Sequence, residues 1–236
     1  MLALIRSLLK TALACAAAAI CMAGWPAWAQ DPPPRIPLFV VDLHGVFPGF
    51  PIEQALADSR GLGPSGLSEL PGRAFGGDIA VHVYPFRWRA ITFGIGARAI
   101  GARATKEPDP IPGTTLVAVT EKFSYIGPEL SFNFGTGSGW SYLSAGINAS
   151  HWSVIPKCGP SLPNCPEGTD SPPLPPDEER LKTLTYGGGA RWFARPHVAF
   201  SFDVRFYAIN PSSPYGPLPV SPRTTLLVIG AGISIK

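Results

Sequence analysis

Hydrophobic and polar residues alternate most clearly along residues 197–209. Apolar side chains occupy every even position from 198 to 208, whereas the odd positions carry Ala199, Ser201, Asp203, Arg205 and Tyr207. A period of two places successive side chains on opposite faces of a β-strand. The same period recurs in seven further segments, and the eight segments are residues 38–47, 78–84, 91–99, 129–134, 143–150, 184–192, 197–209 and 225–236. The sequence therefore predicts an all-β protein with eight strands.

The connections between these segments fall into two length classes that alternate along the chain. Three are short, at residues 86–88, 135–139 and 194–196, and four are long, at residues 50–72, 106–113, 156–180 and 210–223. Alternate connections of an up-and-down sheet emerge at the same end, so the four long loops share one end. We expect a closed, eight-stranded, antiparallel up-and-down barrel that crosses a membrane, with the long loops outside the cell.

The alternation of apolar and polar residues does not by itself decide whether the apolar face lies inside or outside the barrel. A soluble ligand-binding barrel of the lipocalin kind places that face inside. Here the polar face is crowded with Gly, Ser and Ala and a few charges of both signs, which suits a narrow interior better than a solvated exterior. Aromatic residues gather toward the predicted strand ends, as they do in interfacial girdles. These residues are Trp88, Trp140, Tyr142, Trp152, Trp192 and Phe193. We therefore expect the apolar face to contact lipid.

The first 29 residues have the three parts of a secretory signal peptide. Residues 1–10 carry Arg6 and Lys10 without an acidic residue, residues 11–23 are apolar apart from Thr11, and Ala27-Trp28-Ala29 forms a cleavage pattern. The apolar part is shorter than the roughly 20 residues that a membrane-spanning helix needs. We expect cleavage after Ala29, which leaves a barrel domain of residues 30–236 exported to the Gram-negative outer membrane.

Charge and cysteine content narrow the class of partner. The chain has 19 Lys and Arg against 16 Asp and Glu, and 17 against 16 without Arg6 and Lys10, so nothing points to a nucleic acid. Of the four cysteines, Cys15 and Cys21 lie in the signal peptide. Cys158 and Cys165 lie in one Pro-rich and Gly-rich loop, and in an oxidising compartment we expect them to form a disulfide. No neighbouring His or Cys completes a metal site, so we expect no metal and no cofactor.

The signal peptide, the eight amphipathic strands and the loop asymmetry together resemble the small outer-membrane β-barrels over residues 38–236. The pattern is similar to the OmpA-type transmembrane domain and to the OmpW group. The resemblance implies a non-enzymatic envelope protein, structural or acting through its loops, with a narrow channel for small or apolar solutes as the alternative. It also implies contact with outer-membrane lipid and lipopolysaccharide, and with periplasmic chaperones and the barrel-assembly machinery. Such barrels often end in an aromatic residue, whereas this chain ends in Lys236.

One short motif suggests an enzyme as a lesser alternative. Lipid A deacylases in the outer membrane carry a His-x-Ser pair, in which the histidine activates the serine toward an acyl ester. His151 and Ser153 share this spacing, and residues two apart share one face of a strand. The next acidic residue is Glu167, in the following loop. The competing interpretation is a His and a Ser at the barrel rim that face lipid headgroups.

The charged residues on the polar face of the predicted strands indicate what fills the interior of the barrel. An eight-stranded barrel has an interior just wide enough for side chains to fill it, and buried charges must pair. We expect each of the three arginines to contact at least one of the four carboxylates, with two histidines able to add positive charge. The predicted network comprises Asp42, His44, Asp78, His82, Arg98, Glu129, Arg191, Asp203 and Arg205.

Overall fold

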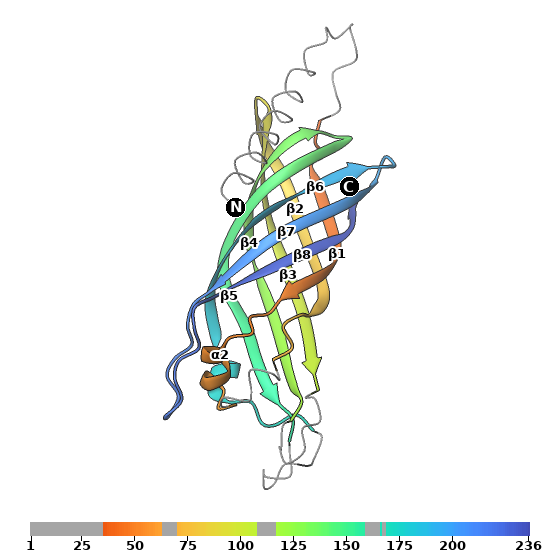
Figure 1. Ribbon diagram of the computed structural model, residues 1–236. Helices are drawn as coiled ribbons and strands as arrows, with labels where there is room; N and C mark the ends of the chain where they lie inside the picture. The colour runs from red at the N-terminus through yellow and green to blue at the C-terminus, as the bar shows by residue number, and fades with distance from the viewer. Residues whose placement is uncertain (1–34, 63–69, 108–116, 159–165, 167–168) are drawn as a thin grey trace, which may run out of the picture. The chain divides into compact units, whose positions relative to one another are not determined.

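The alternating segments form eight strands that close into a barrel in the computed structural model (Figure 1). The structure describes residues 35–62, 70–107, 117–158, 166 and 169–236. Each strand pairs antiparallel with the next one in the chain, and the first pairs with the last, which confirms the predicted fold. The strands are β1 (Phe39–Gly49), β2 (Phe75–Trp88), β3 (Ile91–Lys106), β4 (Val119–Thr136), β5 (Gly139–Pro156), β6 (Arg180–Phe193), β7 (Val198–Ile209) and β8 (Thr224–Ile235).

The connections have the predicted asymmetry. The hairpin turns lie together at the upper end of Figure 1, and the described parts of the long connections lie at the other end. Two of these long connections carry short helices, α2 (Gln54–Ser59) and α3 (Pro175–Glu178). We call the two ends of the barrel the turn end and the loop end. No helix within the described residues is long and apolar enough to cross a membrane.

Several strands extend beyond the predicted segments, and two of these wrong boundaries have a clear structural reason. The first hairpin turn lies at Arg89 and Ala90, beyond the predicted residues 86–88, because β2 continues to Trp88 after a register shift between Val83 and Phe86. Arg89 adopts a φ of 54°, in the left-handed region that tight hairpin turns use.

The second wrong boundary concerns β4, which begins at Val119, about ten residues before the alternating segment 129–134. Pro128 obscures the pattern because proline cannot donate to a strand ladder. The ladder from β4 to β5 is interrupted between the pairs Tyr125–Ser150 and Leu130–Ala145. In this gap the side-chain amide of Asn148 donates a hydrogen bond to the Ile126 carbonyl at 2.5 Å. The side chain therefore replaces a missing backbone partner.

The side chains alternate between the interior and the outer surface as the parity predicts. Along β7, Phe202 is 42% exposed and its neighbours Ser201 and Asp203 are buried. The outer surface is accordingly rich in apolar side chains. Its exposed large hydrophobic residues include Phe39, Leu43, Ile79, Val81, Ile95, Ile126, Leu130, Leu143, Ile147, Phe200, Ile229 and Ile233.

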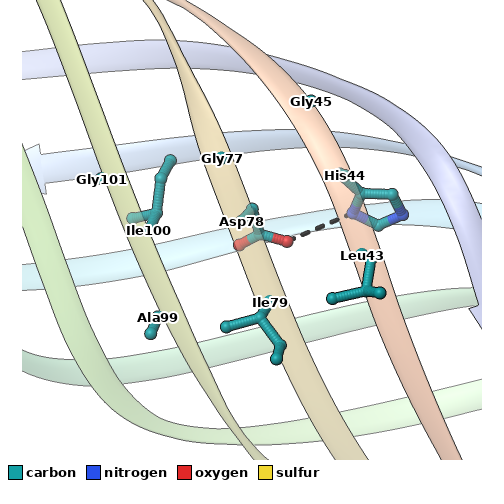
Figure 2. Close-up of a pocket in the computed structure, with 9 residues that line it drawn as sticks. All are labelled: Leu43, His44, Gly45, Gly77, Asp78, Ile79, Ala99, Ile100 and Gly101. Carbon is teal, nitrogen blue, oxygen red and sulfur yellow. Dashed lines mark hydrogen bonds and ion pairs between the residues drawn. The ribbon is translucent and has the colours of Figure 1, made fainter.

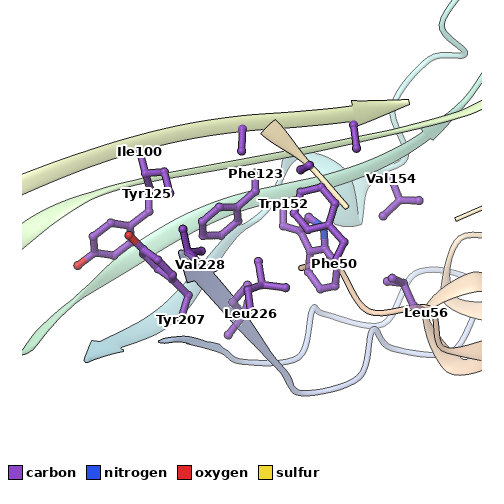
Figure 3. Packing of buried hydrophobic residues seen from close by; sticks show 14 of the residues in the cluster. Phe50, Leu56, Ile100, Phe123, Tyr125, Trp152, Val154, Tyr207, Leu226 and Val228 are labelled. Carbon is purple, nitrogen blue, oxygen red and sulfur yellow. The ribbon is translucent and has the colours of Figure 1, made fainter. Parts of the chain in front are cut away.

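The interior is layered along the barrel axis. At the loop end, side chains from the barrel wall pack with Phe50, Leu56 and Leu70 of the first long connection in one apolar cluster (Figure 3). Tyr207 lies at the inner side of this cluster, with its ring 5.2 Å from that of Phe123. A smaller apolar cluster at the turn end contains Val40, Tyr84 and Trp140. Between the two clusters the interior is polar, and this polar layer holds the charges that the sequence analysis singled out.

Candidate functional sites inside and outside the barrel

All nine residues of the predicted network are buried in the interior, each no more than 5% exposed. They come from β1, β2, β3, β4, β6 and β7, so the network spans the barrel wall almost all the way round. Strand parity places them there, because each stands on the inward row of its strand. The barrel thus brings together charges that are as many as 163 positions apart in the sequence, from Asp42 to Arg205.

Asp42 and Arg191 form a bidentate pair across the interior. The Arg191 guanidinium donates through Nε to Asp42 Oδ1 at 2.8 Å and through its terminal nitrogen Nη2 to Oδ2 at 2.6 Å. The Ser234 hydroxyl also donates to Asp42 Oδ1. The guanidinium lies over the Tyr142 ring, with 4.1 Å between the guanidinium carbon and the ring centroid. This geometry combines a charge-assisted fork with a cation–π contact.

Arg98 and Arg205 converge on Glu129. Arg98 donates to Glu129 Oε2 at 2.9 Å and to Asp78 Oδ1 at 2.7 Å. Arg205 donates to Glu129 Oε1 at 2.8 Å and to Asp203 Oδ1 at 3.2 Å. Each arginine therefore serves two carboxylates, and Glu129 uses a different oxygen for each arginine. This sharing lowers the entropy lost per contact, because one ordered side chain serves several partners.

The two histidines occupy the remaining gaps between acids. His44 lies with Nδ1 3.2 Å from Asp78 Oδ1 and with Nε2 2.8 Å from the Ser201 hydroxyl. His82 lies between two carboxylates, 3.6 Å from Asp42 and 3.8 Å from Glu129. Four carboxylates face three arginines, so one histidine proton would balance the charge. Both ring nitrogens of His82 face acids, whereas those of His44 face one acid and one hydroxyl.

Some network partners were missed by the sequence analysis. Tyr142 donates to Asp203 at 2.7 Å, and Ser144 accepts from Arg205 at 2.7 Å. Both stand on inward rows, as do Ser201 and Ser234, so the parity that located the charges also marks these hydroxyls. The earlier assignment of Tyr142 to an interfacial girdle is wrong, as are those of Trp140 and Trp152, because all three side chains are buried in the interior.

A second buried ion pair joins two of the long connections at the loop end. Arg60 follows α2 and donates through Nε to Asp177 of α3 at 2.8 Å. Asp177 also accepts from the backbone N–H of Val154, at the loop end of β5, at 2.9 Å. Glu121 is buried on the inward row of β4, and its carboxylate has no hydrogen-bond partner among the described residues. Arg60 and Asp177 lie in or beside helices of four and six residues, which are too short for a period in the sequence to indicate which way a side chain points.

His151 and Ser153 lie on the outer face of β5, near its loop end. A recess of about 530 Å³ in the outer wall has both residues in its lining, together with Ser124, Arg103 and Lys122. None of the residues that line this recess is a carboxylate. The sequence's candidate acid, Glu167, lies outside the described residues. Within the described part of the chain, the His-x-Ser pair therefore stands among cations and hydroxyls, without the acid that would orient a catalytic histidine.

The loop that follows β5 carries Cys158, which is 2% exposed. The Thr169 hydroxyl donates to its sulfur at 3.4 Å. Cys165 lies outside the described residues, as do Cys15 and Cys21 of the N-terminal segment, so the pairing of Cys158 with Cys165 stays a prediction. No group of three or more His, Cys, Asp or Glu among the described residues is placed to hold a metal ion.

Comparison with known proteins was made by sequence and by structure. No protein-family model and no curated protein sequence matches the chain. The Neisserial surface protein A structure is 15% identical, with 84% of this chain and 96% of that chain covered and a TM-score of 0.47. The attachment invasion locus protein Ail of Yersinia pestis, in complex with the heparin analogue sucrose octasulfate, is 12% identical, with 84% and 97% covered and a TM-score of 0.45.

A third structure, the N-terminal β-barrel domain of Pseudomonas aeruginosa OprF, is 10% identical, with 84% of this chain and 96% of that chain covered and a TM-score of 0.35. The likeness to all three is one of fold. The predicted closed, eight-stranded antiparallel barrel is confirmed by the strand pairing of the chain itself.

The interior network predicts a large effect for a single interior substitution. Arg98→Met leaves Asp78 with His44 and Glu129 with Arg205 as their remaining partners, and removing one member of a buried ion-pair network destabilises a protein by up to about 3 to 5 kcal/mol. Urea unfolding of the purified protein, followed by tryptophan fluorescence, measures this loss. Arg195→Met is the control, because Arg195 is exposed in the turn between β6 and β7. A loss no larger than that of the control would show that water already solvates these charges.

Proposed function

We propose that this chain is an outer-membrane β-barrel of the Gram-negative envelope that crosses the membrane with its eight strands. Support comes from the apolar outer surface, since a water-soluble barrel of this size would leave those side chains without a partner. The exposed Trp88 and Trp192 at the turn end fit an interfacial girdle. The grouping of the long connections at one end fits the extracellular side of such barrels.

The second part of the proposal is that the barrel does not conduct ions and serves the envelope as a structural or surface-interacting protein. The filled interior supports it. The polar layer is cross-linked by three arginines, and apolar clusters close it at both ends. An ion passing through would have to separate paired charges and cross apolar packing. The described interior therefore favours the non-channel function over a narrow, OmpW-like conduit.

Surface interaction through the loop end is the more specific form of this proposal. The Arg60–Asp177 pair holds two long connections against the barrel mouth, which would present their outer residues on a fixed base. An enzymatic role at His151 and Ser153 is the weaker alternative, because the described lining offers no acid to orient the histidine. We infer export with cleavage after Ala29, followed by transfer from periplasmic chaperones to the barrel-assembly machinery.

Planar-bilayer recording tests the non-channel function. Purified, refolded protein added to a lipid bilayer should give no discrete current steps, because paired side chains and apolar clusters block the lumen. A refolded porin inserted under the same conditions confirms that the bilayer reports conduction. Regular current steps that grow with the amount of inserted protein would make the conduit the better function.

The membrane assignment predicts the effect of a charge on the outer face. Phe202→Arg should weaken folding into phosphatidylcholine vesicles by about 2 to 4 kcal/mol, since an arginine near the bilayer midplane is costly. Phe202→Leu, which keeps the position apolar, should have a small effect. Urea titration of the vesicle-folded proteins measures both. Equal stability of the arginine and leucine variants would indicate that this face does not contact lipid.

The predicted disulfide between Cys158 and Cys165 can be tested by counting free thiols. Thiol labelling of the mature protein under denaturing conditions should add no label before reduction and two labels after it, because Cys158 and Cys165 are the two cysteines left once the signal peptide is removed. Intact-mass measurement counts the labels. Two labels on the unreduced protein would exclude the disulfide.

A further inference from the structure

We propose that the outer face of β3, β4, β5 and β6 binds the phosphorylated saccharolipid of the outer leaflet, lipid A, through a cluster of basic residues near the loop end. The cluster comprises Arg103, Lys122, His151, Arg180 and Lys182, which we call the basic patch. The inference rests on the proposed membrane location and goes beyond it by naming the lipid and the residues that hold it.

Strand register brings the basic patch together. Arg103 of β3 lies directly opposite Lys122 of β4, and His151 of β5 lies directly opposite Arg180 of β6. Lys182 is two residues further along β6 and shares its outward row. Each of the five residues lies within five positions of the loop-side end of its strand. The patch therefore lies on the lipid-facing wall at the level where outer-leaflet headgroups would contact it.

The charges of the basic patch are largely uncompensated within the protein. Like charges directly opposite each other on neighbouring strands are unfavourable, and Arg103 and Lys122 form such a pair. Lys122 has one acidic partner, Asp170, at 3.3 Å, but the two side chains are 41% and 39% exposed and such a pair contributes little. Arg103, Arg180 and Lys182 form no ion pair with any residue that the structure describes. A bound anion would relieve this repulsion.

The wall around these basic residues is hollowed, and the lining combines hydrogen-bonding groups with apolar side chains such as that of Phe75. The recess of about 530 Å³ has Arg103, Lys122 and His151 on its sides with the hydroxyls of Ser124 and Ser153. A neighbouring recess of about 170 Å³ is lined by Ser124, His151 and Arg180, with the Asn148 amide. Cations combined with neutral donors at one site suit phosphate oxygens, which accept several strong hydrogen bonds at once. The same set gives the His-x-Ser spacing a binding role in place of a catalytic one.

A groove lies across β1, β2 and β3 (Figure 2), and its lining is apolar apart from His44 and Asp78, which are themselves buried. The groove has a volume of about 710 Å³. Gly45, Gly77 and Gly101 lie in register on three neighbouring strands, and their lack of side chains leaves this part of the outer wall open. Leu43 and Ile79 border it. Gly101 lines both the groove and the larger recess, so the two spaces adjoin. The juxtaposition of a cationic recess with an apolar groove matches a lipid whose phosphate and acyl chain lie side by side.

The spread of the basic patch favours a headgroup with more than one phosphate. Strands in a sheet lie about 4.8 Å apart, so Arg103 on β3 and Arg180 on β6 are separated by roughly 15 Å of wall. A phospholipid headgroup with a single phosphate would engage one end of the patch. The two phosphates of a diglucosamine headgroup would engage Arg103 with Lys122 at one end and Arg180 with Lys182 at the other.

Retention of lipid by the folded protein tests the proposal. The protein is folded into phosphatidylcholine vesicles that contain equal amounts of lipid A and phosphatidylglycerol, and native mass spectrometry then identifies the lipids that stay bound. Wild-type protein and the exposed-arginine control Arg195→Gln should retain lipid A in preference to phosphatidylglycerol. The double variant R103Q/K122Q should retain about tenfold less lipid A, because it loses two charge-assisted contacts.

Two further measurements separate binding from folding. In vesicles of phosphatidylcholine alone, R103Q/K122Q should be at least as stable toward urea as the wild type, because it removes a repulsive pair; with lipid A present, the order should reverse. Gly101→Val should fold normally, since a Cβ at Gly101 meets no atom within 4 Å, yet it should also reduce lipid A retention by filling the groove. Displacement of the retained lipid by inorganic phosphate alone would show that the groove contributes nothing, and would overturn the lipid part of the proposal.

The outcomes distinguish this proposal from the proposed function. If the wild-type protein fails to fold into phosphatidylcholine vesicles, the membrane location itself is wrong. If the wild type folds but R103Q/K122Q and Arg195→Gln retain equal amounts of lipid A, the basic patch is not the site and the membrane location stands. Equal retention of phosphatidylglycerol and lipid A by the wild type would overturn the preference for a headgroup with two phosphates.

Discussion

The narrow interior of an eight-stranded barrel is the constraint on which the rest of this structure depends. Closing eight strands leaves room for side chains and little else, so every inward residue must pack or pair. This chain satisfies the constraint with ions in the middle and apolar side chains at both ends. Because Arg191 of β6 binds Asp42 of β1 and Arg205 of β7 binds Glu129 of β4, the network also links strands that are not neighbours in the sheet.

The same constraint explains why the polar residues lie inside and the apolar residues outside. Charges can be buried when they find partners, and a ring of strands supplies these partners from all sides. Apolar residues such as Phe200 and Phe202 then face outward, where lipid is the environment that suits them. The burial of the charged residues and the exposure of the apolar residues both support the proposed membrane location.

If the barrel does not conduct, as we propose, its function resides at its outer wall or at its loop end, because side chains fill the described interior. Both places carry features that folding alone does not require. Arg60 and Asp177 form a buried pair between two long connections, and the basic patch holds Arg103 directly opposite Lys122. Like charges directly opposite each other on neighbouring strands are unfavourable, and this is one reason for proposing a ligand beside Arg103 and Lys122.

Much of the fold was determined by the sequence itself, because a period of two is a local property that a single strand reveals. Parity placed Asp42, Glu129 and Arg191 on the inward rows, and the narrowness of the barrel implied that they would meet. The length of β4 was not predictable in this way, since Pro128 breaks the pattern and only a neighbour, Asn148, supplies the missing hydrogen bond. The tertiary structure alone decided which acid meets which arginine, the Arg60–Asp177 pair, and the register that sets Arg103 beside Lys122. These contacts depend on the stagger between strands and on the paths of irregular loops, and neither of them leaves a periodic trace in the sequence.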